Sequence, residues 1–194
     1  MYYKSNGKRT MKSSELIGNG LLKRLEDNDF DKVYTLMDMS FPDDEHRSYV
    51  EQKKLLNNSK YIIYVMPDDE NNDIKAFITV YRFEDFAFVE HFAVNPNYRN
   101  QGIGSLILKE LKKILKCRIC LEVELPKTEN AKKRISFYER NGFYLNQYPY
   151  VQPPFSENKH EIPLWVMTTG HAVEIDEFEQ IKKVLFKDVY HIYE

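Results

Sequence analysis

The sequence predicts a mixed α/β (α+β) domain in which about seven strands form a central sheet covered by helices. Short aromatic and β-branched runs alternate along the chain with longer segments whose apolar residues recur at helical spacing. The helical segment 103–115 lies between two strand-like runs, an order that normally joins two parallel strands by a right-handed crossover. With 194 residues, 42% of them hydrophobic, the chain is long enough to bury one sizeable core.

The chain divides into an arm, a main domain and a C-terminal extension. Residues 1–19 are rich in Ser, Asn, Gly and Lys and lack periodicity, which predicts a flexible N-terminal arm. Residues 20–170 carry the strand and helix patterns of the main domain. Residues 171–194 add one helix, predicted for 176–190, with acids in its first turn and lysines later, as the helix dipole favours. This helix either packs on the domain or forms a homodimer contact.

Each element of the main domain has a pattern and an end signal. The strand segments are rich in branched and aromatic residues, and two helices end at Pro42 and Gly142. A hairpin is predicted across Glu84 and Asp85. The predicted strands are 20–27, 60–68, 73–85, 86–94, 118–125, 143–150 and 162–169. The predicted helices are 28–41, 45–58, 103–115 and 129–142.

The composition argues against several classes of function. The net charge is −2 with acids and bases interspersed, so no basic stripe predicts binding to nucleic acid or to an anionic membrane. No run approaches the roughly 20 apolar residues that span a bilayer, and the N-terminus lacks the apolar segment of a signal peptide. We therefore expect a cytoplasmic protein without nucleic-acid or membrane partners.

Cys117 and Cys120 form a single Cys-x-x-Cys pair. A structural zinc site normally needs four ligands, and the sequence offers no second pair. A thioredoxin-like redox motif needs the pair at the start of a helix, whereas the residues that follow alternate like a strand. We therefore expect ordinary cysteines at a strand entry, and no metal.

The junction before helix 103–115 carries Gly102 and Gly104, although the chain has only 7 glycines. A strand that enters a helix through a glycine-bearing turn exposes unpaired backbone amides, where the helix dipole favours an anion such as phosphate. Arg99, just before the glycines, can add charge-assisted contacts. The alternative is that the glycines ease a tight turn or let the helix pack close to the sheet. Neither a P-loop nor a Gly-x-Gly-x-x-Gly pattern is present.

Two segments resemble a known family. Arg99-Asn100-Gln101-Gly102-Ile103-Gly104 resembles the Gln/Arg-x-x-Gly-x-Gly/Ala signature of the GNAT superfamily of acyl-CoA-dependent N-acyltransferases. "ISFYERNGF" is similar to that family's later helix, where an aromatic-Tyr pair precedes Gly-Phe. The order of predicted elements matches over about residues 20–170. The resemblance implies a mostly antiparallel sheet with one parallel, splayed pair, helices on both faces, and an N-acetyltransferase that uses acetyl-CoA.

The resemblance also implies where coenzyme A lies. The amides of residues 99–105 would bind its pyrophosphate, and its pantetheine arm would pair with the preceding strand at 92–94. A backbone N–H near Phe92 or Val94 would stabilise the oxyanion. Asn130 departs from the pattern, because the family often has Asn one residue later, where this chain has Ala131. The implied cofactor-binding residues are Phe92, Ala93, Val94, Arg99, Asn100, Gln101, Gly102, Ile103, Gly104, Ser105 and Asn130.

An amine acceptor is mostly protonated at neutral pH, since its pKa is about 10.4, so some group must take its proton. Glu90 is the predicted general base, because similar small-molecule acetyltransferases have an acid at this place. Strand alternation gives Glu90 apolar neighbours, which should raise its pKa. These neighbours are Phe86, Phe88, Phe92 and Val94. Alternatively, Glu90 forms a structural pair with a lysine or arginine. A local bulge, common near active sites, would shift this face assignment. His91, on the opposite face by alternation, is the second choice.

Tyr138, the tyrosine of "FYERNGF", would by resemblance donate a proton to the leaving thiolate, whose free thiol has a pKa of about 8.5. The alternative is an ordinary core aromatic on an amphipathic helix.

The sequence does not identify the acceptor, which is a small-molecule or peptide amine. Acidic groups would attract a cationic amine such as a polyamine, an aminoglycoside or a lysine side chain, and aromatic groups would wall an apolar pocket or pack their loop onto the body. The acids are Asp43, Asp44, Glu45, Glu122 and Glu124, and the aromatics are Tyr148, Tyr150 and Phe155. The rival hypothesis is a non-catalytic acyl-CoA-binding domain used for sensing.

Overall fold

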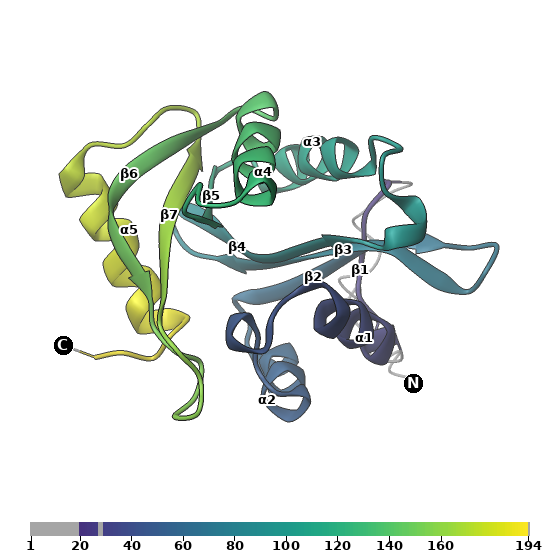
Figure 1. Cartoon of the computed structure of the whole chain (residues 1–194). Coiled ribbons are helices and arrows are strands. Elements are labelled where there is room, and N and C mark those ends of the chain that lie inside the picture. Colours follow the sequence, from purple (N-terminus) through teal and green to yellow (C-terminus); the bar gives the residue numbers. More distant parts are fainter. Residues whose placement is uncertain (1–19, 27–28, 194) are drawn as a thin grey trace, which may run out of the picture.

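A seven-stranded mixed sheet forms the centre of the computed structural model, which describes residues 20–26 and 29–193 (Figure 1). The strand order is β1-β2-β3-β4-β5-β7-β6. Only β4 and β5 pair in parallel among the described strands, and every other pair is antiparallel. The predicted fold class is therefore confirmed. The strands are β1 Lys23–Arg24, β2 Tyr61–Asp68, β3 Asp73–Arg82, β4 Phe86–Val94, β5 Arg118–Glu124, β6 Phe143–Gln152 and β7 Ile162–Thr169.

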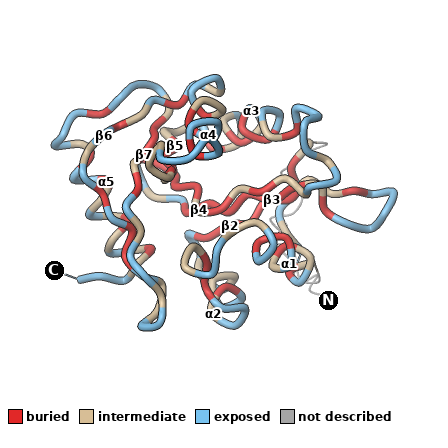
Figure 2. The backbone as a smooth tube through the Cα atoms, viewed as in Figure 1, coloured by how far each residue is buried: buried red, intermediate tan, exposed pale blue. Residues whose placement is uncertain are grey.

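Helices cover both faces of the sheet, as expected. Figure 1 shows α3 and α4 on one side, and α1 and α2 on the other. Figure 2 shows buried residues along the central strands β3 and β4, between these two layers. Each face has its own apolar cluster: Val33 of α1 lies in one, and Ile107 of α3 lies in the other. The helices are α1 Phe30–Ser40, α2 Tyr49–Lys54, α3 Ile103–Leu115, α4 Glu129–Arg140 and α5 Ile175–Asp188.

Helix α2 begins later than the predicted residue 45. The Ser48 side chain accepts from the Glu51 N–H, and the Glu51 side chain accepts from the Ser48 N–H, which is a capping box that fixes the first turn. Residues 43–45 form a separate short 3₁₀ turn. Arg47 therefore lies in the linker before α2, where its side chain is free to turn toward the sheet.

The parallel strands separate partway along their length. Pairing between β4 and β5 runs from Phe86 and Arg118 to Val89 and Leu121 and then stops, although both strands continue. At the same level β4 carries a bulge, since Glu90 and His91 lie opposite the single residue Thr79 of β3. The implied splay of this strand pair is therefore present, and it opens a gap in the sheet.

The bulge overturns one prediction about β4. Simple alternation predicted that Glu90 shares a face with Phe92 and Val94 while His91 faces the other way. Phe92 and Val94 instead pack with the α3 and α4 cluster. Glu90 and His91 both turn to the α1 face, where Glu90 contacts Arg47 and His91 contacts Phe41. The extra residue shifts the face of everything that follows it.

The C-terminal helix α5 packs on the body of the domain. Its residues Phe178, Ile181 and Leu185 are buried in the same apolar cluster as α1. The predicted arm, residues 1–19, lies outside the described residues. Within the part of the chain that the structure describes, no helix combines the length and apolar character needed to cross a membrane.

Candidate active site

A cavity of about 600 Å³ lies where β4 and β5 separate. Its walls come from the end of β4, the first turn of α3, the β5 residues beyond the last pair, and α4. Most of the predicted site residues line it together. They are Glu90, Phe92, Ala93, Val94, Arg99, Asn100, Gly102, Ile103, Gly104, Ser105 and Tyr138.

Two predicted cofactor residues lie elsewhere. Gln101 turns away, and its side-chain amide is 3.5 Å from the Asn97 carbonyl oxygen. Asn130 is exposed in the first turn of α4 and does not line the cavity, while the next residue, Ala131, is buried. Lys133 and Arg134, one turn further along α4, line the cavity instead. Neither is among the site residues predicted from the sequence, although consecutive basic residues at this point of the later helix were a visible signal.

The two glycines at the start of α3 serve different purposes. Gly102 is the N-cap and has a φ of 75°, a left-handed conformation that favours glycine, and a Cβ there would point into open space. A Cβ at Gly104 would lie 3.0 Å from the Phe137 ring of α4. Gly102 therefore shapes an open cradle, whereas Gly104 permits close packing between α3 and α4.

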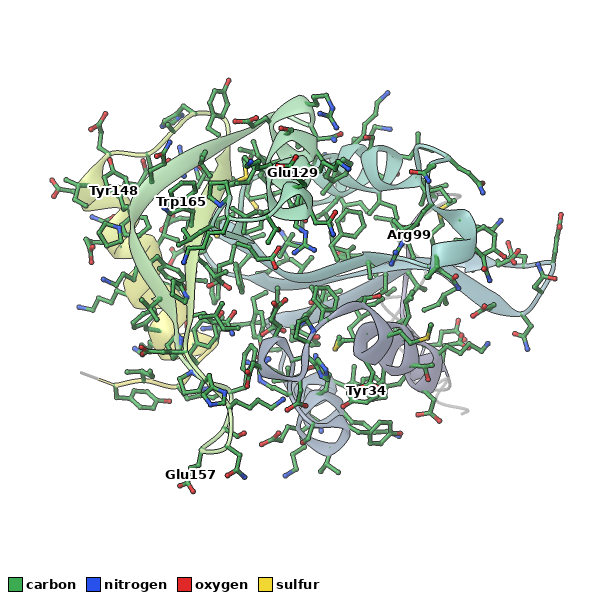
Figure 3. The ribbon with its side chains drawn as sticks, in the orientation of Figure 1. Tyr34, Arg99, Glu129, Tyr148, Glu157 and Trp165 are labelled. Carbon is green, nitrogen blue, oxygen red and sulfur yellow. The ribbon has the colours of Figure 1, made fainter. Side chains whose placement is uncertain are left out.

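The cradle presents backbone donors and positive charge. The first main-chain hydrogen bond into α3 is from the Leu106 N–H to the Gly102 carbonyl oxygen, at 3.2 Å, so the amides before Leu106 lack helical partners. Arg99 lies beside the end of β4, where its Nε donates to the Val94 carbonyl oxygen at 3.0 Å (Figure 3). These groups suit a phosphate-bearing ligand.

Glu90 forms a buried ion pair. Its Oε1 lies 2.5 Å from Nη1 of Arg47, and the two side chains are only 2% and 8% exposed. Burial alone would raise the pKa of Glu90, but the Arg47 charge and the contact with His91 outweigh burial and hold that pKa at about 2. The predicted rise in the pKa of Glu90 is therefore wrong, because the alternative, a structural pair with a basic residue, is present with Arg47 as the partner.

The Arg47 side chain contacts three segments: β4, the residues after α5 and the β6–β7 connection. Its Nη2 donates to the Val189 carbonyl oxygen at 2.9 Å, and its guanidinium lies 4.2 Å from the centre of the Phe155 ring. His91 lies alongside: its Nε2 donates to the Glu45 carbonyl oxygen at 2.8 Å, and its Nδ1 is 3.4 Å from Glu90 Oε2. The Glu90 carboxylate is thus held in a fixed orientation.

Tyr138 of α4 lies in the cavity wall and is otherwise buried in the α3 and α4 cluster. Burial raises the pKa of its hydroxyl to about 12. The phenol therefore keeps its proton throughout the neutral range and can donate a hydrogen bond into the cavity.

A second carboxylate, that of Glu122, lies across the gap, and its pKa is raised whereas that of Glu90 is lowered. Glu122 of β5 lines the cavity, and its carboxylate accepts hydrogen bonds from the hydroxyls of Tyr150 and Tyr190. Burial raises the pKa of Glu122 to about 7, against the two hydrogen bonds, which lower it. From the sequence, Glu122 is only one of several candidate acids for the acceptor site, because its partner Tyr190 is distant in the chain.

The other predicted acceptor groups hold loops in place. Lys159 contacts Asp43, and the His160 N–H donates to Asp44 at 3.0 Å, so these two acids bind the β6–β7 connection. Tyr148 donates to the Val173 carbonyl oxygen at 3.1 Å, and its ring packs against Phe178 of α5 (Figure 3). Tyr148, Tyr150 and Phe155 pack this part of the chain onto the body and do not line the cavity. Besides Glu90 and Glu122, the acids that line it are Glu45 and Glu124.

The cysteines lie at the strand entry as expected. Cys117 precedes β5, Cys120 is buried within it, and burial raises the pKa of both thiols. Among residues 20–26 and 29–193, no cluster of three or more His, Cys, Asp or Glu side chains is arranged to hold a metal ion.

Comparisons with known proteins agree with this geometry. The sequence model of the "Acetyltransferase (GNAT) family" matches residues 30–143. "Putative acetyltransferase YjbC" of Bacillus subtilis is 31% identical over 149 residues, which cover 73% of this chain and 74% of that protein.

Solved structures show the same fold. One is titled "Putative acetyltransferase from GNAT family from Bacteroides thetaiotaomicron" and superposes with a TM-score of 0.80 at 33% identity, covering 89% of this chain and 99% of that one. An aminoglycoside 6'-N-acetyltransferase complexed with coenzyme A superposes with a TM-score of 0.57 at 17% identity, covering 76% of this chain and 95% of that one. The chain belongs to the GNAT acetyltransferase family.

Proposed function

We propose that this protein transfers an acetyl group from acetyl-CoA to a primary amine by direct attack. The observation that carries the proposal is one cavity that joins the Gly102 cradle, the gap between β4 and β5, and Tyr138. A non-catalytic acyl-CoA-binding domain would need the cradle and the gap, but not a protonated tyrosine beside several carboxylates.

The residues present fit acetyl-CoA. Gly102 leaves the cradle open, and the N–H groups at the start of α3 would hold the diphosphate. Lys133 and Arg134 add positive charge to the cavity wall. Acetyl-CoA would supply the activated acyl group as a thioester.

The main chain of β4 beyond Val89 is free to pair with an extended ligand. Glu90 is partly exposed as a residue although its side chain is only 2% exposed, so the exposed atoms belong to the main chain. Backbone groups here lack β5 partners, because the pairing ends at Val89 and Leu121. These groups would bind the pantetheine amides and stabilise the oxyanion, as in other cases where an added strand pairs with a sheet edge.

Tyr138 would donate a hydrogen bond to the departing sulfur. Its pKa of about 12 lies above the roughly 8.5 of a free thiol, so complete proton transfer to the thiolate is unfavourable. A charge-assisted hydrogen bond is worth about 1.5–3 kcal/mol, which is enough to speed the loss of the thiolate appreciably.

Glu90 as the general base stays a prediction, and its surroundings argue against it. A carboxylate with a pKa of about 2 is a poor proton acceptor at neutral pH, since proton transfer is efficient near the working pH. Glu90 is better suited to hold Arg47 and to add negative charge to the acceptor end of the cavity.

The acceptor proposed is a cationic amine. Glu45, Glu90, Glu122 and Glu124 all line the cavity. Within the part of the chain that the structure describes, only Glu90 and Glu124 of these four pair with arginines, Arg47 and Arg134. The remaining carboxylates would attract an ammonium group. A cytoplasmic location and a homodimer stay predictions.

The test is thiol release from acetyl-CoA with spermidine, kanamycin and a lysine-containing peptide, with coenzyme A binding measured by calorimetry. We expect at least one amine to release thiol well above hydrolysis, and Tyr138→Phe to reduce this rate while coenzyme A still binds. Binding without amine-dependent thiol release would favour the acyl-CoA-binding domain.

A further inference from the structure

We propose that Glu122 is the general base that takes the proton from the acceptor amine, and that Tyr150 and Tyr190 orient its carboxylate. This inference rests on the proposed N-acetyltransferase function. It assigns to β5 the role that the sequence predicted for Glu90 of β4.

The position of Glu122 in the sheet supports the assignment. Leu121 is the last β5 residue paired with β4, so Glu122 is the first residue of β5 beyond the point of separation. Glu90 occupies the equivalent place on β4, and both residues line the same cavity. Glu122 therefore lies beside the gap into which the thioester of the proposed substrate would extend.

Two tyrosines hold the Glu122 carboxylate without neutralising it. Tyr190 Oη lies 2.8 Å from Oε2 and 3.0 Å from Oε1, and the Tyr150 hydroxyl donates to Oε1. Burial raises the pKa of both tyrosines well above the usual value, so they remain hydrogen-bond donors. A carboxylate has about four acceptor positions, and two hydroxyl protons leave room for an ammonium group.

The groups around Glu122 give it affinity for a proton near neutral pH. Burial raises its pKa to about 7, and the negative charge of Glu90 on β4 raises it too. The hydrogen bonds from Tyr150 on β6 and from Tyr190 after α5 lower the pKa, as does His91. Cys120, two residues earlier on β5, stays a neutral thiol because burial raises its pKa. A base with a pKa near the working pH combines a large ionised fraction with adequate basicity.

The proton balance of the step is simple. The ammonium group gives one proton to the Glu122 carboxylate, which becomes a neutral acid, and the free amine attacks the thioester carbonyl. A C–N bond forms, the C–S bond breaks, and the sulfur leaves as the coenzyme A thiolate, hydrogen-bonded by Tyr138. The second proton lost by the nitrogen goes to the thiolate or to water, and Glu122 returns its proton to water.

Part of this arrangement lies outside the region that the family model matches. That match ends at residue 143, whereas Tyr150 and Tyr190 follow it. Val189, next to Tyr190, also supplies the carbonyl oxygen that binds Arg47. The residues after α5 therefore bind Glu122 directly and hold Arg47, which is the ion-pair partner of Glu90.

The first experiment measures the pKa of Glu122 without substrate, by ¹³C NMR of protein labelled at glutamate carboxyl carbons. The Glu122 signal is assigned by its absence in Glu122→Gln. We expect a midpoint near 7, which moves to higher pH in Tyr190→Phe, because a hydrogen bond to the ionised form is lost. Glu90→Gln should move the midpoint to lower pH, because a nearby negative charge is lost. A midpoint near 4.5 in the wild type would overturn the proposal.

The second experiment is the pH dependence of kcat/KM for the best amine of the panel. For the wild type, kcat/KM should rise as the pH passes through about 7. For Tyr190→Phe, this rise should occur at a higher pH. Glu122→Gln should lower kcat/KM at neutral pH about 100-fold or more. Its kcat/KM should also no longer rise as the pH passes through about 7. Glu84→Gln, the same change at an exposed hairpin residue, is the matched control and should behave like the wild type.

The outcomes separate the two proposals. If Glu122→Gln keeps both the rate and the rise of kcat/KM with pH while the wild type turns over, only the assignment of the base is wrong. If the wild type binds coenzyme A but acetylates no amine, the proposed function is wrong and the catalytic role of Glu122 falls with it.

Discussion

Replacing Glu90 by Gln should destabilise the protein strongly, whatever its effect on catalysis. The change removes the negative partner of Arg47, which lies 2.5 Å away and is buried. The remaining Arg47 contacts, the Val189 carbonyl and the Phe155 ring, carry no full negative charge. Removing one member of a buried ion pair typically costs about 3–5 kcal/mol, because the other charge stays buried without compensation.

The pH dependence of stability gives a second estimate of the same quantity. The pKa of Glu90 falls from 4.5 to about 2 on folding, which corresponds to roughly 3 kcal/mol. Because the pKa is lowered, this stabilisation is present above pH 4.5 and is lost as the pH falls toward 2. By pH 3 the wild type should have lost about 2 kcal/mol of it. The two estimates agree in size.

The assay is urea unfolding at pH 7 and pH 3, followed by circular dichroism, for the wild type, Glu90→Gln and the exposed control Glu84→Gln. At pH 7 Glu90→Gln should lose about 3–5 kcal/mol, and the control should stay within about 0.5 kcal/mol. At pH 3 the gap between Glu90→Gln and the wild type should shrink by about 2 kcal/mol. The double variant Arg47→Met/Glu90→Met should recover most of the loss. Equal stability of Glu90→Gln and the control at pH 7 would refute the buried ion pair.

Three further predictions concern the coenzyme end of the cavity. Gly102→Asn should change the unfolding free energy by less than about 1 kcal/mol, because Asn tolerates positive φ. The same change should weaken coenzyme A binding in calorimetry at least tenfold. Unchanged affinity would show that the turn at Gly102 does not bind coenzyme A. Gly104→Ala should cost about 1–3 kcal/mol in urea unfolding through the Phe137 contact, and Phe137→Leu in the same chain should restore most of it; an additive loss would contradict this packing. Tyr138→Phe should lower kcat about 10- to 100-fold with little change in the affinity for coenzyme A, and an unchanged kcat would make Tyr138 a packing residue.

The fold could be predicted from the sequence because local patterns and global topology agree in this chain. The apolar spacing of 103–115 identified α3 with the same bounds that the structure gives. The order of a strand, a helix and a second strand predicted the parallel pair of β4 and β5, and the glycine pattern predicted a turn at Gly102, which has a positive φ. Gly142, with a φ of 74°, follows α4 as the pattern indicated. Each of these signals depends only on residues close in sequence.

The chemistry of the acids could not be predicted in this way, because it depends on distant partners. Nothing in the run that contains Glu90 and His91 indicates that one extra residue lies opposite Thr79, yet this bulge decides which way both side chains point. Arg47 precedes Glu90 by 43 residues and meets it only because the capping box of α2 leaves Arg47 in a linker. Sequence alternation therefore gave the wrong face for His91 and the wrong sign for the pKa of Glu90.

The two acids at the gap differ in their neighbours rather than in their strands. Glu90 faces a guanidinium, which holds its pKa at about 2, while Glu122 faces two phenols and the Glu90 charge, which leaves its pKa at about 7. Two carboxylates with pKa values pushed apart by their surroundings commonly divide a binding role from a proton-transfer role. Here the surroundings come from the linker before α2 and from the residues after α5. Since neither segment belongs to the glycine motif, relatives that share the motif but differ in these segments should use a different base.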